Sequence, residues 1–426
     1  MPATDVDVLV LGAGAAGLAC RYALSGRRDV VCLEAAEEVG GLLRMFRHGD
    51  FTFDTTLHVL PSRSAMAGTI LESLIGDEAR AFPKRNLVWQ RGRVIDYPYQ
   101  FNSHALPHEV REECLAGLPA ARRDAPSPDR RSFEVWLLDQ FGPGFYRHFF
   151  EPYNRKLYGV DPSELEAAPM TWTIPADNRE AALRGARAPH PGGAVVECTY
   201  PTGLDGIHVV PKRLAERGTG EILLGERVTR VDLDARTAWT ARGKIFHYRD
   251  MVSTLPLPTL LRCVEGLPAS IADWSVRLHA RPVTNIRVAI ARSGDGLPGL
   301  WTYFPDPEIP FYRLSRLSSI SPDLMPPGAE ACLLECAGDD PVKEETIVAL
   351  CRELGVAGDG DVRVAGSLVI PHAYVLFKHG HRDGAEAAIR YLAERGVRVA
   401  GRYGCWAYSN IAQTLDTGLR AAAELM

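Results

Sequence analysis

The pattern of apolar and polar residues is clearest at the start of the chain. Residues 7–11 (DVLVL) are short, β-branched and bounded by glycine, which predicts a buried strand. Residues 18–24 carry apolar side chains at helical spacing, and residues 30–33 predict a second strand. The predicted order is strand, glycine-rich turn, helix and strand, the unit from which a parallel α/β sheet is built.

Further along the chain the pattern is less regular. Residues 106–129 are helical at first and then rich in Arg, Asp and Pro, and residues 133–158 predict one or two helices interrupted at residues 142–144 (GPG). Residues 195–235 are β-like, and residues 378–383 (KHGHRD) predict a polar, solvated loop. The other predicted elements are strands at 221–224, 228–233, 246–255, 283–291, 331–335 and 397–400, and helices at 384–395 and 410–426.

Three glycines follow the first predicted strand, and Glu34 closes the second. Gly12 permits a tight turn out of the strand, Gly14 lets the backbone approach a pyrophosphate, and Gly17 lets the helix pack close to the sheet. The N–H groups and the dipole at the start of that helix favour phosphate. Glu34 would accept hydrogen bonds from a ribose 2′-OH and would repel the 2′-phosphate of NADP. The spacing therefore predicts a dinucleotide-binding fingerprint.

Two segments indicate that the dinucleotide is FAD. Residues 34–44 (EAAEEVGGLLR) resemble the extended motif of FAD-dependent oxidoreductases, in which the glycine pair passes the pyrophosphate and ribityl chain. Residues 399–402 (VAGR) precede the last predicted helix and match the place where such flavoproteins bring a second backbone segment to the flavin. The residues expected to bind FAD are Gly12, Gly14, Ala15, Ala16, Gly17, Glu34, Ala35, Gly41, Leu42, Val228, Gly401, Arg402, Asn410 and Ile411.

These two half-sites at opposite ends of the chain predict an interleaved α/β architecture. We expect an FAD-binding, Rossmann-type (glutathione-reductase-like) domain with an inserted substrate domain of mixed sheet and helices. With 426 residues, the chain is long enough for more than one core. Residues 1–60, 195–265 and 385–426 are predicted to form the discontinuous FAD domain. Residues 61–194 would form a helical substrate region, and residues 266–384 the substrate-domain sheet.

Composition narrows the class of protein. The apolar content of 46% and charged content of 24% are those of a soluble globular protein, and the net charge of −5 argues against a nucleic-acid partner. No apolar run is long enough to span a membrane, and residues 1–7 lack the pattern of a signal peptide, so a cytoplasmic location is predicted. The nine cysteines show no metal-ligand spacing, so no metal site is expected. We expect a small-molecule substrate, and predict no oligomeric state.

Beyond the fingerprint, the chain resembles the UDP-galactopyranose mutase family of amine-oxidase-like flavoproteins over nearly its whole length. His58, in residues 53–60 (FDTTLHVL), falls where that family has a histidine beside the flavin. Residues 141–165 match a helical segment that carries nucleotide-holding aromatic residues, and residues 310–313 (PFYR) match the segment with a diphosphate-binding arginine. The resemblance implies catalytic roles for His58, Arg313, Tyr374 and Tyr408, and substrate-binding roles for Tyr153, Tyr158, Arg313, Tyr374 and Tyr408.

The resemblance also implies a reaction, the interconversion of pyranose and furanose forms of a nucleotide sugar. Reduced FAD acts as a covalent nucleophile at the anomeric carbon, the nucleoside diphosphate leaves and returns, and no net oxidation occurs. Arg313 would bind the diphosphate through two hydrogen bonds, a geometry for which Arg suits phosphate better than Lys. Tyr374 and Tyr408 would donate to the same oxygens, and Tyr158 would stack on the base.

Three positions depart from the family pattern and keep a second function open. Thr56 and Leu57 stand where glycine usually precedes the histidine, Asn410 stands at an often acidic position, and residues 172–174 lack the expected second diphosphate arginine. Arg179 or Arg155 could replace that arginine. The alternative is an FAD-dependent oxidase or dehydrogenase of an amine or alcohol, including a sugar or aminosugar.

A third reading is a flavin-bound subunit without chemistry. The individual residues have structural alternatives as well. Arg313 could form a salt bridge to a nearby acid. The four tyrosines could be core residues.

Overall fold

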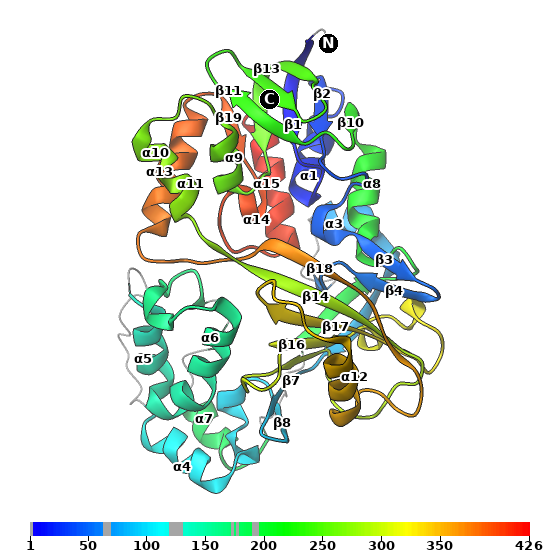
Figure 1. The fold of residues 1–426 in the computed structure, drawn as a ribbon, viewed down its shortest axis with the longest axis vertical. Coiled ribbons are helices and arrows are strands. Elements are labelled where there is room, and N and C mark those ends of the chain that lie inside the picture. Colours follow the sequence, from blue (N-terminus) through cyan, green and yellow to red (C-terminus); the bar gives the residue numbers. More distant parts are fainter. Residues whose placement is uncertain (1–2, 63–69, 119–130, 172–173, 176–178, 190–195) are drawn as a thin grey trace.

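The computed structural model describes residues 3–62, 70–118, 131–171, 174–175, 179–189 and 196–426. The second half of the segment predicted at 106–129 and positions 172–173 of the missing arginine lie outside these residues. Two seven-stranded sheets form the frame of the molecule, one in the upper and one in the lower half of Figure 1.

The first sheet is mainly parallel and contains the predicted strand–turn–helix–strand unit. Four of its strands run parallel in the order β10, β2, β1 and β13, with β19 also parallel beside β13. The antiparallel strands β12 and β11 extend it beyond β13. Its strands are β1 (Thr4–Leu11), β2 (Val30–Leu33), β10 (Glu221–Leu223), β11 (Val228–Asp232), β12 (Thr237–Thr240), β13 (Ile245–Ser253) and β19 (Val397–Val399).

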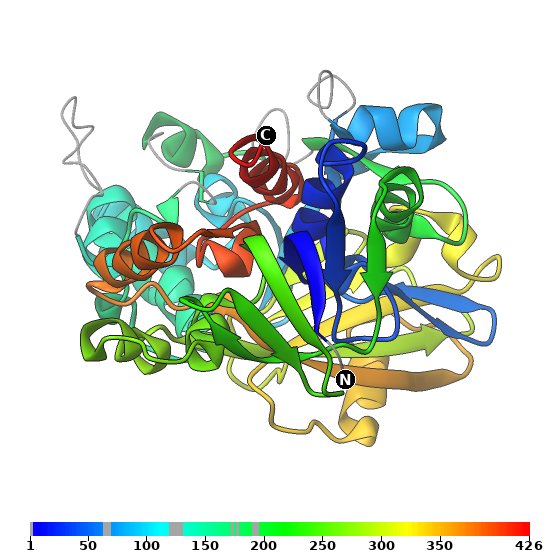
Figure 2. The same cartoon turned by 90° about the horizontal axis from the view of Figure 1, so that it is seen from above.

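Helices cover both faces of the first sheet, which explains why β1 and β2 are apolar without alternation. Val8, Leu9, Val10 and Leu11 are all buried to 1% exposure or less. Figure 2 looks along the sheet and shows the C-terminal helix beside the first helix. The helices of this half are α1 (Ala15–Ala23), α8 (Val209–Arg217), α9 (Leu257–Cys263), α10 (Ala269–Ala272), α11 (Trp274–Arg277), α13 (His381–Ala393), α14 (Gly401–Gly404) and α15 (Ile411–Ala423).

The second sheet is mixed. Its order is β18, β14, β17, β16, β15, β7 and β8, and all neighbours are antiparallel except β15 and β7. Helix α12 (Glu344–Glu353) packs on it (Figure 1). Its strands are β7 (Asn86–Gln90), β8 (Arg93–Asp96), β14 (Ala280–Ile290), β15 (Trp301–Tyr303), β16 (Arg313–Arg316), β17 (Glu330–Ala337) and β18 (Val362–Val375).

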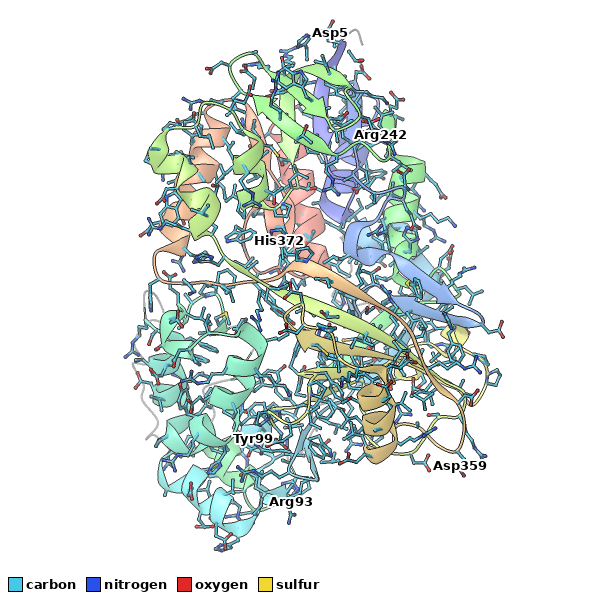
Figure 3. The ribbon with its side chains drawn as sticks, viewed as in Figure 1. Asp5, Arg93, Tyr99, Arg242, Asp359 and His372 are labelled. Atoms are coloured by element: carbon cyan, nitrogen blue, oxygen red, sulfur yellow. The ribbon has the colours of Figure 1, made fainter. Side chains whose placement is uncertain are left out.

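A helical lobe lies beside the second sheet, at the lower left of Figure 1. Its helices are α4 (His108–Ala116), α5 (Phe133–Phe145), a π-helical turn (Tyr146–Phe150), α6 (Glu151–Tyr158) and α7 (Arg179–Gly185). Tyr99, labelled in Figure 3, is fully buried here and stacks on Phe149 with 4.6 Å between ring centroids. Small sheets join the halves: β3 (Met45–His48) with β4 (Phe51–Asp54), and β5 (Leu60–Pro61), β9 (Val196–Pro201) and β6 (Ala79–Lys84). Helix α3 (Ile70–Ile75) follows β5.

Most of the predicted elements are confirmed, including the interruption at residues 142–144, and two corrections have physical causes. The interruption predicted at residues 142–144 is a kink, where Gly142 has φ 76° and ψ 170°. The β-like stretch 195–235 was wrong in its middle, since α8 forms there and buries Val210 and Leu214 on one face. The longest strand, β18, was not predicted, because most of its residues lie at the half-exposed edge of a sheet, where the hydrophobic pattern is weak.

The α/β fold class is confirmed, with a Rossmann-type sheet and a mixed sheet and helical lobe attached to it. The residue boundaries proposed for the two domains stay a prediction. None of the helices in the described residues is long and apolar enough to cross a membrane.

Candidate functional site

The glycine-rich turn leaves no room for side chains at two positions and open space at a third. Gly12 has φ 100°, and a Cβ on it would lie 2.3 Å from the Thr254 Oγ1. A Cβ on Gly17 would lie 1.9 Å from the Gly12 carbonyl oxygen. A Cβ on Gly14 would meet nothing within 4 Å. The open side at Gly14, above a turn closed by its neighbours, fits the close approach of a pyrophosphate.

The start of α1 faces the second glycine pair. Gly14 is the N-cap of α1 and offers no side-chain cap, so the first N–H groups of the helix are available to an anion. Gly14 forms a parallel bridge with Gly40, and a Cβ on Gly41 would lie 3.3 Å from the Gly14 Cα. The structure therefore brings these two glycine segments together. Of the flanking predicted residues, Ala15 and Leu42 are half-buried and Ala16 is buried.

Glu34 follows β2, and its side chain reaches back to the glycine-rich turn. Its carboxylate accepts hydrogen bonds from the backbone N–H of Ala13 at 2.8 Å and of Ala36 at 2.9 Å. Ala35 is exposed, and the buried Val228 begins a strand whose approach is fixed by the Glu226 N–H donating to the Glu34 carbonyl at 2.8 Å. Glu34 and Val228 thus lie on adjoining segments.

The C-terminal segment reaches the same place. Gly401 has φ 80° and a Cβ there would lie 3.1 Å from the Ala16 Cβ. Helix α15 begins at Ile411, which is buried, after the N-cap Asn410. The Asn410 side chain accepts from the Gln413 N–H at 2.9 Å, and the Gln413 side chain accepts from the Asn410 N–H at 3.0 Å. This reciprocal cap gives asparagine a structural role at the position where an acid was expected.

Arg313, which was predicted to bind the substrate, lies in a row of polar side chains on one face of the second sheet. Four polar side chains occupy paired positions on neighbouring strands: Tyr303 opposite Arg313, Arg313 opposite Glu335, and Glu335 opposite Asn285. Residues opposite each other in paired strands project to the same face. The sheet therefore sets a row of tyrosine, arginine, carboxylate and amide side by side.

Arg313 and Glu335 form a bidentate ion pair within this row. The Arg313 Nη2 donates to Glu335 at 2.8 Å, and Nε donates to the other carboxylate oxygen. Glu335 is 5% exposed and Arg313 is 18% exposed, so both charges are largely removed from water. The salt bridge that was the structural alternative for Arg313 is present. The Glu335 carboxylate raises the pKa of Arg313 against the effect of burial, so the guanidinium stays charged within the row.

His58 lies on the loop after β4, tied to the row at one end and to a buried acid at the other. Asn285 is fully buried and its amide donates to the Thr55 carbonyl at 2.8 Å. The backbone N–H of His58 donates to Asp54 at 3.4 Å, and its Nδ1 lies 2.7 Å from the Thr56 carbonyl oxygen. Burial lowers the pKa of His58 to about 4, and the charges of Arg402 and Arg313 act in the same direction. The imidazole is therefore neutral at neutral pH.

Asp54 is a carboxylic acid without a cationic partner among the described residues. It is fully buried and accepts a hydrogen bond from the Tyr200 hydroxyl at 2.5 Å. Burial raises the pKa of Asp54 to about 7, against the hydrogen bonds from Tyr200 and His58, which lower it. The acid thus titrates close to neutral pH beneath the His58 loop.

Arg402 lies among tyrosines. Its guanidinium carbon is 4.2 Å from the Tyr408 ring centroid and 5.8 Å from those of Tyr374 and Tyr403. Its Nη2 donates to the Ala373 carbonyl at 3.3 Å, while the buried Nε has no partner among the described residues. Burial raises the pKa of Tyr374 to about 12, so its hydroxyl keeps its proton.

The two tyrosines of α6 take different neighbours. Tyr158 packs edge-on against Tyr374 at 5.9 Å, and Tyr153 packs between Phe149 and Tyr303 at 5.6 Å from each. Tyr158 thus faces the Arg402 side of the cluster and Tyr153 faces the row on the sheet. The structure brings the predicted substrate residues together, while their roles in binding stay a proposal.

Sequence reasoning missed Glu335, Asn285, Tyr303 and Tyr312, which belong to this cluster. The Tyr312 hydroxyl donates to the Tyr374 hydroxyl at 3.4 Å. Their strands are paired through segments up to fifty residues apart in sequence, so no local spacing connects them. The available signal was a polar residue within a buried strand, Asn285 in β14 and Glu335 in β17.

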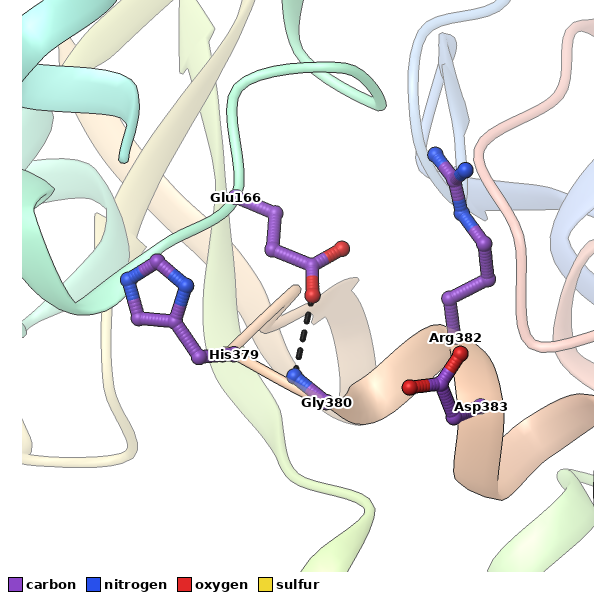
Figure 4. Close-up of a pocket in the computed structure, with 5 residues that line it drawn as sticks. All are labelled: Glu166, His379, Gly380, Arg382 and Asp383. Carbon is purple, nitrogen blue, oxygen red and sulfur yellow. Dashed lines mark hydrogen bonds between the residues drawn. The ribbon is translucent and has the colours of Figure 1, made fainter. Parts of the chain in front are cut away.

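A surface pocket lined by none of these residues lies at the start of α13 (Figure 4). The Glu166 carboxylate accepts from the Gly380 N–H at 2.9 Å, and Gly380, with φ 78°, is the N-cap of α13. The solvated loop predicted at 378–383 is therefore wrong from His381 onward, since helix α13 begins there and buries His381. The residues that line the pocket are Glu166, His379, Gly380, Arg382 and Asp383. No group of three or more potential metal ligands occurs in the part of the chain that the structure describes.

Comparison with known proteins agrees with the dinucleotide-binding fingerprint predicted from the glycine-rich turn. A family model described as flavin containing amine oxidoreductase matches residues 15–426. A crystal structure of reduced UDP-galactopyranose mutase has a TM-score of 0.86 and 23% identity, covering 99% of this chain and 93% of that chain. A putative protoporphyrinogen oxidase from Exiguobacterium sp. 255-15 has a TM-score of 0.74 and 15% identity, covering 100% and 99%. Cyclohexylamine oxidase from Brevibacterium oxydans IH-35A has a TM-score of 0.69 and 17% identity, covering 99% and 98%.

At these identities, the structural likenesses show the fold alone. The family match covers nearly the whole chain and confirms the prediction that FAD is the cofactor of an enzyme. The chain belongs to the family of flavin-containing amine oxidoreductases.

Proposed function

We propose that the protein is a UDP-galactopyranose-mutase-like isomerase that interconverts pyranose and furanose forms of a nucleotide sugar. The observation that carries this proposal is a pair of guanidinium groups in one tyrosine cluster. The Arg402 guanidinium carbon is 5.8 Å from the Tyr374 ring centroid, and that of Arg313 is 5.9 Å from the ring centroid of Tyr312, whose hydroxyl donates to Tyr374. Two cations and phenolic donors suit a diphosphate, which must be held while it is detached from the sugar and then returned. The structural likeness to a reduced UDP-galactopyranose mutase supports the same choice.

The chain's own residues would hold the diphosphate. Arg313 uses Nε and Nη2 for Glu335, which leaves Nη1 for a phosphate oxygen. Arg402 would offer its unpartnered Nε, and Tyr374, protonated because burial raises its pKa to about 12, would donate its O–H. Tyr408 would donate beside Arg402, and Tyr158 and Tyr153 would hold the base between α6 and the sheet.

His58 would act on a sugar hydroxyl. Its Nδ1–H donates to the Thr56 carbonyl, so Nε2 is left as an acceptor in the neutral ring. When bound in its reduced form, FAD would supply the nucleophile for the anomeric carbon, and the isomerisation would involve no net oxidation. The FAD-binding residues named from the sequence, from Gly12 to Ile411, belong to this proposal.

The test uses the purified holoenzyme reduced with dithionite without oxygen. It is incubated with UDP- and TDP-hexoses, and the products are separated by chromatography with mass detection. A new peak of unchanged mass, absent with oxidised enzyme, is expected. Arg313→Met should lose that peak, whereas Arg363→Met, which alters an exposed arginine on β18, should keep it. If no isomer forms from any sugar of the panel, the proposal is overturned.

A second candidate is an oxidase or dehydrogenase of an amine, alcohol or aminosugar. Glu335 favours it, because a buried carboxylate in the substrate row could pair with an ammonium group, and Arg313 is already occupied by that carboxylate. In addition, residues 172–174 (WTI), where a second diphosphate-binding arginine was expected, contain no arginine. Such an enzyme would bleach its oxidised flavin when an amine or aminosugar is added without oxygen.

A further inference from the structure

Three arginines of the described residues are buried, with 5 to 7% of their surface exposed: Arg21, Arg287 and Arg316. Arg21 donates to two backbone carbonyls at 3.0 and 2.6 Å. Arg316 pairs with Glu330 at 2.6 Å and donates to further carbonyls. The guanidinium of Arg287 has no hydrogen bond or ion pair with any described residue, and its buried Nε is unpartnered.

The surroundings of Arg287 make its charge costly. Its guanidinium carbon lies 4.4 Å from the Phe46 ring centroid, and Gly366, opposite on β18, places no side chain beside it. Burial lowers the pKa of Arg287, and the positive charge of Arg44 lowers it further. Two like charges without a carboxylate leave the desolvation of a buried cation uncompensated. An anion from outside the chain would remove that cost.

Arg44 connects this cation pair to the glycine-rich turn. The Arg44 Nε donates to the Gly41 carbonyl at 2.9 Å. Gly40 is bridged to Gly14, and Gly41 lies against the Gly14 Cα. Arg44 and Arg287, which form no ion pair with a described residue, therefore border the Gly40–Gly41 segment, and this segment meets the open N-terminus of α1.

We propose that Arg287, together with Arg44, binds the phosphates of FAD. These phosphates carry the cofactor's permanent negative charge, and a guanidinium binds phosphate oxygens through directed, charge-assisted hydrogen bonds. The residue comes from the second sheet, so the cofactor would be held from both halves of the molecule. The inference concerns the cofactor that both candidate reactions use and does not depend on which reaction is correct.

The test compares apoprotein and holoprotein of Arg287→Met, which keeps the length of the side chain and removes its charge. The apoprotein should unfold at an equal or higher temperature than wild type, because an unpaired buried cation is gone. Its dissociation constant for FAD should rise about tenfold or more, the loss of at least one charge-assisted hydrogen bond. ADP, which carries the same pyrophosphate, should be weakened alike, and riboflavin should be unaffected.

Two controls separate this effect from a general loss of packing. Arg21→Met alters an equally buried arginine whose partners are carbonyls, so it should lower apoprotein stability and change the FAD dissociation constant less than about twofold. Arg287→Lys keeps the charge and should retain FAD binding better than Arg287→Met. It also tests the role of the charge if Arg287→Met fails to fold. Unchanged FAD and ADP binding in Arg287→Met overturns the proposal. Weaker riboflavin binding or a lower flavin reduction potential, with ADP binding unchanged, also overturns it, since Arg287 would then face the flavin ring.

Discussion

The two ends of the proposed site are built in different ways: the glycine-rich turn proposed for the cofactor (the cofactor end) and the polar row around Arg313 proposed for the substrate (the substrate end). At the cofactor end, the chain offers backbone: Gly12, Gly14 and Gly17 shape a turn, and the start of α1 presents its N–H groups. At the substrate end, the second sheet offers side chains, with Arg313 and Glu335 adjacent on paired strands. The first construction is local in sequence, and the second exists only after strands from distant segments have paired.

The difference is also energetic. At Gly12 and Gly17 the turn leaves no room for a side chain, so a single added methyl group at either position is enough to break it. The substrate row holds two charges nearly removed from water, which are stable only as a pair. Substitutions at the cofactor end should therefore act by sterics, and substitutions at the substrate end by electrostatics.

The largest effect is expected for Gly17→Ala. Its Cβ would lie 1.9 Å from the Gly12 carbonyl oxygen, so β1 and α1 would have to separate. We expect more than about 4 kcal/mol of destabilisation and no bound flavin, measured by thermal unfolding and flavin absorbance. Gly14→Ala is the matched control, because its Cβ meets nothing, and it should fold while binding FAD more weakly. A Gly17→Ala protein with full flavin content would contradict the steric account.

The next effect is expected for Glu335→Gln. The variant keeps the shape of the side chain but leaves the Arg313 charge without a carboxylate in a largely buried place. We expect a loss of about 3–5 kcal/mol in the free energy of unfolding, measured in urea. Replacing both partners by apolar residues (Arg313→Met with Glu335→Leu) should recover most of it. Asp361→Asn, in an exposed pair with Arg363, should change stability by less than about 1 kcal/mol. Equal effects of the two single variants would remove the electrostatic distinction.

The same contrast explains what the sequence could predict. Residues 7–34 could be interpreted because the glycine spacing, the helix and Glu34 all act within one local unit. The residues predicted on the substrate side came from the family resemblance, and the structure places His58, Arg313, Arg402, Tyr374 and Tyr408 in one cluster.

What could not be predicted depends on sheet pairing. Glu335 and Asn285 reach Arg313 and the His58 loop only through the register of β14, β16 and β17. Strand β18 was missed because its edge position gives it no regular apolar alternation. Arg287 carries no sequence signal either, since an arginine in a buried strand could as well have had a carboxylate opposite it.

A smaller, opposite-signed pair of effects is expected from Asp54 and His58, which lie under the substrate end. The folded-state pKa of His58 is lowered to about 4 from an ordinary 6.5, so the unfolded chain takes up the proton first and stability falls as pH drops through that window. The folded-state pKa of Asp54 is raised to about 7 from 3.8, so the folded state holds the proton and stability falls as pH rises through that window.

The contributions of His58 and Asp54 to the slope of stability against pH oppose each other between about pH 4 and 6.5. Removing either titrating group should therefore reveal the slope due to the other. Asp54→Asn should make stability rise more steeply with pH than wild type, and His58→Gln should make it fall more steeply. Each change in slope is at most about 1.4 kcal/mol per pH unit, the value for one proton. Urea unfolding at several pH values measures both. Parallel curves for all three proteins would mean that neither group has a shifted pKa.

The smallest effect on stability is expected for Tyr374→Phe. The hydroxyl takes part in one weak hydrogen bond, from Tyr312 at 3.4 Å, and the ring keeps its edge-on contact with Tyr158. The free energy of unfolding should change by less than about 1 kcal/mol. If the hydroxyl donates to a substrate phosphate, KM for the nucleotide sugar should nevertheless rise about three- to tenfold. Tyr391→Phe, on helix α13 with its ring against Arg395, is the control and should leave KM unchanged. An unchanged KM for Tyr374→Phe would make Tyr374 a core tyrosine, and the substrate end would then rest on its arginines alone.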